Sequence, residues 1–171
     1  MEWNGGELMY DVLDVSRYII NYSNEKDYSI SNLKLQKLLY FVQAYFLMMT
    51  GEPCFEEKIE AWNFGPVVPK AYQEFKEYGS GEIPEIKSYM VVNRKTVDGE
   101  TKIHITREKF DKKCIKESDG KYIEDVVDKF ADYSALDLVR ITHNQDPWKE
   151  AYSAYQNNEI TIENIRRYFD E

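Results

Sequence analysis

The segment from Ser31 to Gly51 constrains the fold of this chain more than any other. Ser31 is a good helix N-cap, and Gly51 suits the left-handed conformation that commonly ends a helix. Between them, one set of apolar residues recurs at helical spacing and a second set covers the remaining sides. A helix that is apolar nearly all round lies at the centre of a bundle. The two sets are Leu35, Leu38, Leu39, Val42, Phe46 and Met49, and Leu33, Tyr40, Phe41, Tyr45 and Leu47.

Shorter helical patterns occupy most of the remaining chain. They run over residues 12–22, from Pro69 to Gly79, over residues 122–130, and from Ser134, Asp146 and Thr161 onward. Ser134 with Asp137 three residues later forms a capping arrangement, and Asp146 followed by Pro147 predicts an N-cap and a proline at the first helical position. Thr161 is expected to cap the last helix.

Two segments favour β structure. Residues 58–64 alternate in character and predict a short strand, with Gly65 and Pro66 as a turn into the next helix. Residues 88–106 predict a β-hairpin, because two β-prone runs flank Asp98 and Gly99, a pair typical of a type I′ turn. We therefore expect a mainly α (α+β) fold, a compact helical bundle around a central apolar helix with a small β-hairpin. It forms a single domain over residues 1–171, in which residues 1–10 are an N-terminal extension.

The net charge bears on partners and location. The formal charge is −9 and the pI is about 4.9, which opposes phosphate binding, so direct nucleic-acid binding is not expected and a basic protein partner is favoured. The only cysteines, Cys54 and Cys114, lack disulfide or metal-site spacing, and we expect reduced thiols in the cytoplasm. The apolar runs of the central segment fall well short of the roughly 20 residues of a membrane span, so no membrane partner is expected.

Signs of catalysis are weak. Phosphate-loop, dinucleotide-binding, zinc-protease and serine-hydrolase motifs are absent from the sequence. His143 and Asp146 could act as a base and its orienting partner, but His143 at a helix C-terminus and Asp146 as a cap explain both residues structurally. A Cys–His pair has no spacing that supports it. We expect no catalytic residue, no metal and no cofactor.

Three stretches combine large apolar side chains with helix-boundary residues: 33–41 (LKLQKLLYF), 61–69 (AWNFGPVVP) and 142–148 (THNQDPW). Trp62, Tyr72 and Trp148 suit either a core or an interface, with core preferred. Lys34 and Lys37 lie on the apolar central helix. They either extend to solvent, the default for such lysines, or contact an acidic group.

The same stretches resemble the Panacea domain of GepA-type phage-associated proteins and SocA-type antitoxins. The likeness rests on the run from Leu33 to Tyr40, on the order and spacing of the later motif residues, and covers most of the chain. The later motif residues are Ala61, Trp62, Gly65, Pro66, Val67, Pro69, Tyr72, Phe75, Tyr78, Gly79, Thr142, His143, Pro147, Trp148 and Ala151.

The resemblance implies an antitoxin that binds and neutralises a toxin encoded beside it. Alternatives are an adaptor that delivers its partner to a protease complex, a prophage protein that binds a host target, and a small enzyme that uses His143. The hairpin region matches the family least, so partner choice is expected to vary there. Candidate partner-binding residues, which could equally be fold determinants, are Lys34, Lys37, Trp62, Phe64, Gly65, Pro66, His143, Pro147 and Trp148.

Overall fold

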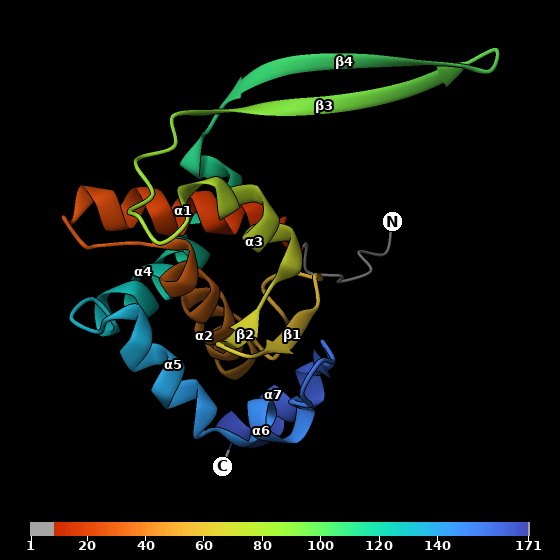
Figure 1. Ribbon diagram of the computed structural model, residues 1–171. Helices are drawn as coiled ribbons and strands as arrows, with labels where there is room; N and C mark the ends of the chain where they lie inside the picture. Colours follow the sequence, from red (N-terminus) through yellow and green to blue (C-terminus); the bar gives the residue numbers. More distant parts are fainter. Residues whose placement is uncertain (1–8, 171) are drawn as a thin grey trace, which may run out of the picture.

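Helix α2 (Asn32–Thr50) runs through the centre of the computed structural model, and other helices surround it (Figure 1). The structure describes residues 9–170, so residues 1–8 of the predicted N-terminal extension lie outside the described residues. The Ser31 hydroxyl accepts the backbone N–H of Lys34, and Gly51 adopts φ +78° at the C-terminal end. The predicted caps and bounds of the central helix are confirmed.

Five helices, α1, α3, α4, α5 and α7, pack directly on α2, and α6 packs against α5 and α7. Ser134 and Asp137 form a complete capping box at the start of α5, as predicted. Helix α3 ends in a 3₁₀ turn (Lys76–Tyr78), and a second 3₁₀ turn (Lys112–Cys114) precedes α4. The helices around α2 are α1 (Val12–Glu25), α3 (Pro69–Phe75), α4 (Glu117–Lys129), α5 (Ala135–His143), α6 (Asp146–Ala151) and α7 (Ile162–Phe169). The mainly α prediction is confirmed.

One predicted cap is wrong. Asp146 is the first residue of α6, and Gln145 takes the N-cap position without a side-chain hydrogen bond. The Asp146 carboxylate instead lies 3.7 Å from the Lys149 ammonium, one turn further along the helix. At the last helix, by contrast, the Thr161 hydroxyl accepts the backbone N–H of Asn164 as expected. Within residues 9–170, no helix combines the length and the apolar character that crossing a membrane requires.

A small antiparallel sheet lies beside α2. Strand β1 (Ile59–Trp62) pairs with β2 (Gly65–Val67) on one side and with β5 (Glu159–Ile160) on the other. Gly65 and Pro66 were predicted to form a turn into α3, but they are strand residues opposite Trp62 and Ala61. The turn lies earlier, at residues 63–64. Pro66 is tolerated in β2 because β2 is an edge strand, where a residue without a backbone N–H can be accommodated.

Strands β3 (Ser88–Val97) and β4 (Glu100–Lys109) form the predicted hairpin. Asp98 and Gly99 have φ of +54° and +81°, which agrees with the predicted type I′ turn. The hairpin runs to Lys109 and so is longer than the segment 88–106 inferred from the sequence. Figure 1 shows this two-stranded ribbon projecting from the helices, with its turn far from the rest of the molecule.

Candidate functional site

The two lysines of the first motif are buried on α2. Lys37 has no exposed surface and its Nζ donates a hydrogen bond to the Pro66 carbonyl at 2.8 Å. Lys34 is 6% exposed and its Nζ donates to the Ala131 carbonyl at 3.0 Å. The prediction that these side chains extend to solvent is therefore wrong. Each ammonium instead hydrogen-bonds to the backbone of a segment distant in sequence and so links that segment to the central helix.

The two buried glutamines of α2 act in the same way. The Gln36 side-chain oxygen accepts the backbone N–H of Val68 at 3.0 Å, at the entrance to α3. The Gln43 side chain donates to the Phe55 carbonyl at 2.8 Å and accepts the backbone N–H of Cys54 at 2.8 Å. Buried backbone groups outside regular structure need such partners. The polar positions of this apolar helix therefore organise the loop and strands that follow it.

Lys37 occupies a site that only glycine at position 65 leaves open. Gly65 has φ +96°, and a Cβ there would lie 2.8 Å from the Lys37 Cε and 2.8 Å from the Thr142 Oγ1. Burial lowers the pKa of Lys37 to about 7, because the charged ammonium loses its hydration in this position. The first, second and third motifs thus meet in one buried contact between α2, β2 and α5.

Three aromatic rings are stacked next to this contact. The His143 ring lies 3.9 Å from that of Trp148, and Trp148 lies 4.4 Å from Tyr152, both pairs at an interplanar angle of 18°. The Trp148 Nε1 donates to the Trp62 carbonyl at 2.9 Å, and the Tyr152 hydroxyl donates to the Asn63 side-chain oxygen at 3.0 Å. These bonds tie α6 to the β1–β2 turn.

His143 is placed for stacking. Burial lowers the pKa of His143, and the positive charge of Lys37 lowers it further. Its Nε2 is buried and has no hydrogen-bond partner within the described part of the chain. A neutral imidazole held flat against Trp148 extends the aromatic stack rather than adding a charge to it.

The nine candidate residues fall into three groups by exposure. Five are buried, three are half-buried, and Phe64, at 58% exposure, offers most of its side chain to solvent. Eight gather around the β1–β2 turn and the start of α6, whereas the Lys34 side chain on α2 reaches the α4–α5 connection. The buried group is Lys34, Lys37, Gly65, Pro66 and Pro147, and the half-buried group is Trp62, His143 and Trp148.

Sequence reasoning missed two members of this cluster. Tyr152 follows Trp148 by four residues, a spacing that brings side chains together on a helical turn and could have suggested the stack. Thr142 was seen only as part of a motif. Its hydroxyl hydrogen-bonds to the Leu138 and Val139 carbonyls at 2.9 and 3.1 Å, which fixes one wall of the Gly65 site. Thr142 and Gly65 are far apart in the sequence, so only the tertiary structure reveals that they lie side by side.

Comparison with known proteins gives two matches. Residues 35–149 match the family described as Antitoxin SocA-like, Panacea domain, a span that contains eight of the nine candidate residues. The chain is also similar to Antitoxin SocA of Caulobacter vibrioides (strain NA1000 / CB15N), with 42% identity over 69 residues. That similarity covers 40% of this chain and 37% of the relative, well under half of either. No solved structure matches the chain.

Proposed function

Because the chain belongs to the SocA-like antitoxin family with a Panacea domain, we propose that it neutralises a toxin by direct, non-enzymatic protein binding. The observation that carries the proposal is the match over residues 35–149, which spans the buried Lys37 contact and the aromatic stack. The partner is a cognate toxin in the cytoplasm. We infer no catalytic residue, metal or cofactor for this role.

The candidate residues have two roles in this proposal, one structural and one in contact with the toxin. The buried members, such as Lys37 and Gly65, hold α2, β2 and α5 together and so shape the surface. Phe64 and the half-buried rings of Trp62, His143 and Trp148 form that surface, which suits a partner because exposed aromatic side chains give large contact areas at low entropy cost.

Charge supports rapid capture of a basic toxin. The formal charge of −9 produces a long-range field that speeds the encounter with a positively charged protein and weakens as salt is added. The effect acts on the association rate more than on the affinity. It therefore complements, and does not replace, a specific contact surface.

Bacterial growth tests the proposal. The neighbouring open reading frame is induced alone and then together with this protein, and the two proteins are co-purified. We expect growth arrest by the neighbour, relief on co-expression, and a stable complex. If the neighbour is harmless, or its toxicity persists, the antitoxin proposal fails. Relief accompanied by disappearance of the neighbour from the cells would favour a proteolytic adaptor, and relief lost in His143→Asn with binding intact would favour an enzyme.

Phe64→Ala should weaken toxin binding by about 10-fold without unfolding the protein. The side chain is 58% exposed, so its removal should change the free energy of unfolding by no more than about 0.5 kcal/mol. Loss of an aromatic residue that anchors an interface costs more than that, above about 1 kcal/mol. Titration calorimetry with the purified toxin measures the affinity, and thermal melting measures the stability.

Leu136→Ala is the matched control, since Leu136 is 56% exposed and lies at the opposite end of α5 from His143. It should bind the toxin as the unaltered protein does. Equal affinities for all three proteins would place the toxin away from the β1–β2 turn.

A further inference from the structure

One face of the β3–β4 hairpin carries four apolar side chains that are more than half exposed. Directly opposed residues of an antiparallel pair point to the same side, and alternate residues share a face. The register sets Met90 opposite Arg107, Val92 opposite Ile105, and Arg94 opposite Ile103. These six residues are called the outer face below. The exposed fractions are 52% for Met90, 53% for Val92, 57% for Ile103 and 59% for Ile105.

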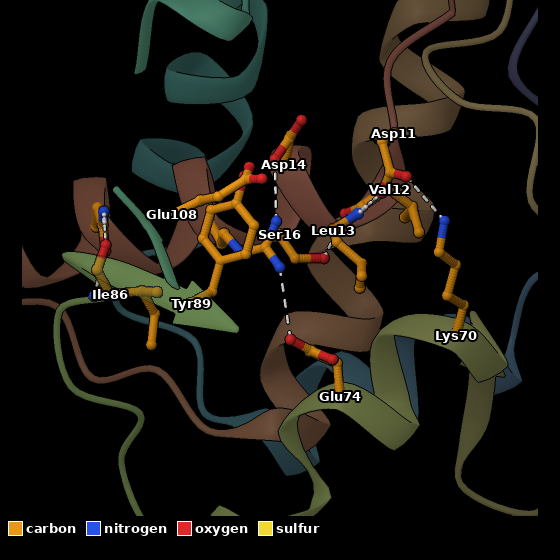
Figure 2. Close-up of polar contacts among 12 residues, drawn as sticks. Asp11, Val12, Leu13, Asp14, Ser16, Lys70, Glu74, Ile86, Tyr89 and Glu108 are labelled. Carbon is orange, nitrogen blue, oxygen red and sulfur yellow. Dashed lines mark hydrogen bonds and ion pairs between the residues drawn. The ribbon is translucent and has the colours of Figure 1, made fainter. Parts of the chain in front are cut away.

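The root of the hairpin fixes the direction of this face. The guanidinium carbon of Arg17 on α1 lies 3.5 Å from the centre of the Tyr89 ring. Arg17 is buried and is held by the carboxylates of Asp14 at 3.0 Å and Glu74 at 3.4 Å. Figure 2 shows Tyr89 and Glu108 beside Asp14, with Glu74 approaching from α3. Tyr89 belongs to the inner face, so Met90 and the rest of the outer face point away from α1.

This arrangement is costly for a free monomer. A two-stranded ribbon is only marginally stable by itself in water, and a contiguous exposed apolar patch usually marks a binding site. The outer face lies on the part of the ribbon that projects from the helices (Figure 1). The inner face has a partner at its root, in Arg17, whereas the outer face keeps its apolar side chains open to solvent.

The charge on the outer face differs in sign from that of the whole chain. Arg94 and Arg107 are its charged side chains, and both are cationic. The hairpin as a whole has five lysines and arginines against three carboxylates, a net of +2 in a chain of −9. Arginine beside exposed apolar groups is enriched at protein interfaces, where its guanidinium pairs with a carboxylate in a fixed geometry. The complementary surface is therefore an apolar strip bordered by carboxylates.

We propose that the outer face is a docking surface for the toxin, and that the toxin presents there an apolar strip bordered by carboxylates. The inference rests on the proposed function and adds the chemistry of the contact. A toxin that is basic overall and carries a local acidic patch satisfies both electrostatic demands. The negative net charge of the chain speeds the approach of the basic toxin. The positively charged hairpin then favours the orientation in which the acidic patch of the toxin meets the outer face.

Binding of the neighbour-encoded toxin to two outer-face variants tests the inference. Ile103→Thr with Ile105→Thr removes apolar surface but keeps β-branched side chains that favour a strand. Arg94→Glu with Arg107→Glu reverses the charge and keeps the apolar strip. Each double variant should raise the Kd by about 30-fold or more, the effect expected of interface anchors.

The control is Lys95→Glu with Lys102→Glu, a directly opposed cationic pair on the inner face of the same ribbon. It makes the same change in net charge as the arginine variant, and its Kd should stay within about 3-fold of the unaltered protein, since rim and non-contact charges contribute little to affinity. Thermal melting and light scattering of each protein establish that the fold and the oligomeric state are retained.

The outcomes separate the two proposals. If the unaltered protein neither relieves toxicity nor binds, the proposed function fails and this inference fails with it. If it relieves toxicity and both outer-face variants bind within about 3-fold of it, the antitoxin role stands and the docking surface is wrong. A chain that is dimeric alone, and that the outer-face substitutions make monomeric without loss of toxin binding, would also overturn the inference. The face would then be a contact between two copies.

Discussion

Replacing Gly65 with alanine should lower the free energy of unfolding by about 4 kcal/mol. A φ of +96° costs a non-glycine residue about 1–3 kcal/mol, because the Cβ meets its own backbone. The new methyl group would also lie 2.8 Å from the Lys37 Cε and from the Thr142 hydroxyl. Overpacking of this kind costs about 1–3 kcal/mol more.

Neither Lys37 nor Thr142 can move away from the new methyl group without loss of hydrogen bonds or packing. Lys37 is fully buried and its ammonium is bound to the Pro66 carbonyl, so a shift of its side chain breaks that hydrogen bond. Thr142 is buried and bonded to two carbonyls of its own helix. The methyl group therefore pushes β2 away from both α2 and α5.

Chemical denaturation measures the loss, and Gly51→Ala is the matched control. Gly51 has a similar positive φ, +78°, but nothing lies within 4 Å of where its Cβ would be. Its substitution should cost only the backbone term, about 1 kcal/mol. Equal losses at the two positions would mean that the Lys37 site relaxes to admit a methyl group, contrary to the packing described here.

Much of the fold was predictable because its signals are local. Ser31 and Gly51 bound the central helix, and Ser134 with Asp137 caps α5, through hydrogen bonds or dihedral angles within a few residues. The hairpin turn at residues 98–99 is equally local. Such features follow from side-chain type and spacing, without knowledge of the tertiary structure.

The candidate cluster was less predictable because its contacts join distant segments. Lys37 was expected to reach solvent, as lysines on helices do, but Pro66, 29 residues away, supplies a buried acceptor. The partner of Lys34 is 97 residues away. Strand β5 has only two residues and exists through its pairing with β1, so neither length nor periodicity marks it.

The buried and the exposed residues of the candidate cluster are under different structural constraints. The motif residues Lys37, Gly65 and Pro66 are buried and lie together, with the Lys37 ammonium bonded to the Pro66 carbonyl. Close packing restricts which side chains can occupy these buried positions. The exposed faces of the β1–β2 turn and of the hairpin are not restricted in this way. A framework of this kind can present different contact residues without change to its core.

Lys37 should make the stability of the protein depend on pH between about 7 and 9. Its pKa is about 7 in the folded state and about 10.4 in an unfolded chain, so in this window the unfolded state binds the proton more strongly. Stability therefore rises with pH, by up to about 1.4 kcal/mol per pH unit. Below pH 7 the lysine is charged in both states, and its contribution no longer changes.

The measurement compares urea unfolding of the unaltered protein and of Lys37→Met at pH 6, 7, 8 and 9. Methionine fills the space but does not titrate, so the free energy of unfolding of the unaltered protein should rise relative to the variant by about 2 kcal/mol from pH 7 to pH 9. Groups that do not interact with Lys37 cancel in the difference. Cys54 and Tyr40, whose pKa values burial raises, titrate in both proteins, and His143, with its lowered pKa, titrates below the window.

Lys102→Met controls for the loss of one positive charge, because Lys102 is exposed on the hairpin. Its difference from the unaltered protein should be the same at every pH from 7 to 9. A constant difference for Lys37→Met as well would contradict the assignment, since it would mean that the ammonium stays charged throughout and that burial against the Pro66 carbonyl does not disfavour the charge. A rising difference would show that this buried lysine is held at the cost of stability near neutral pH. That cost is consistent with its place at the contact that joins α2, β2 and α5.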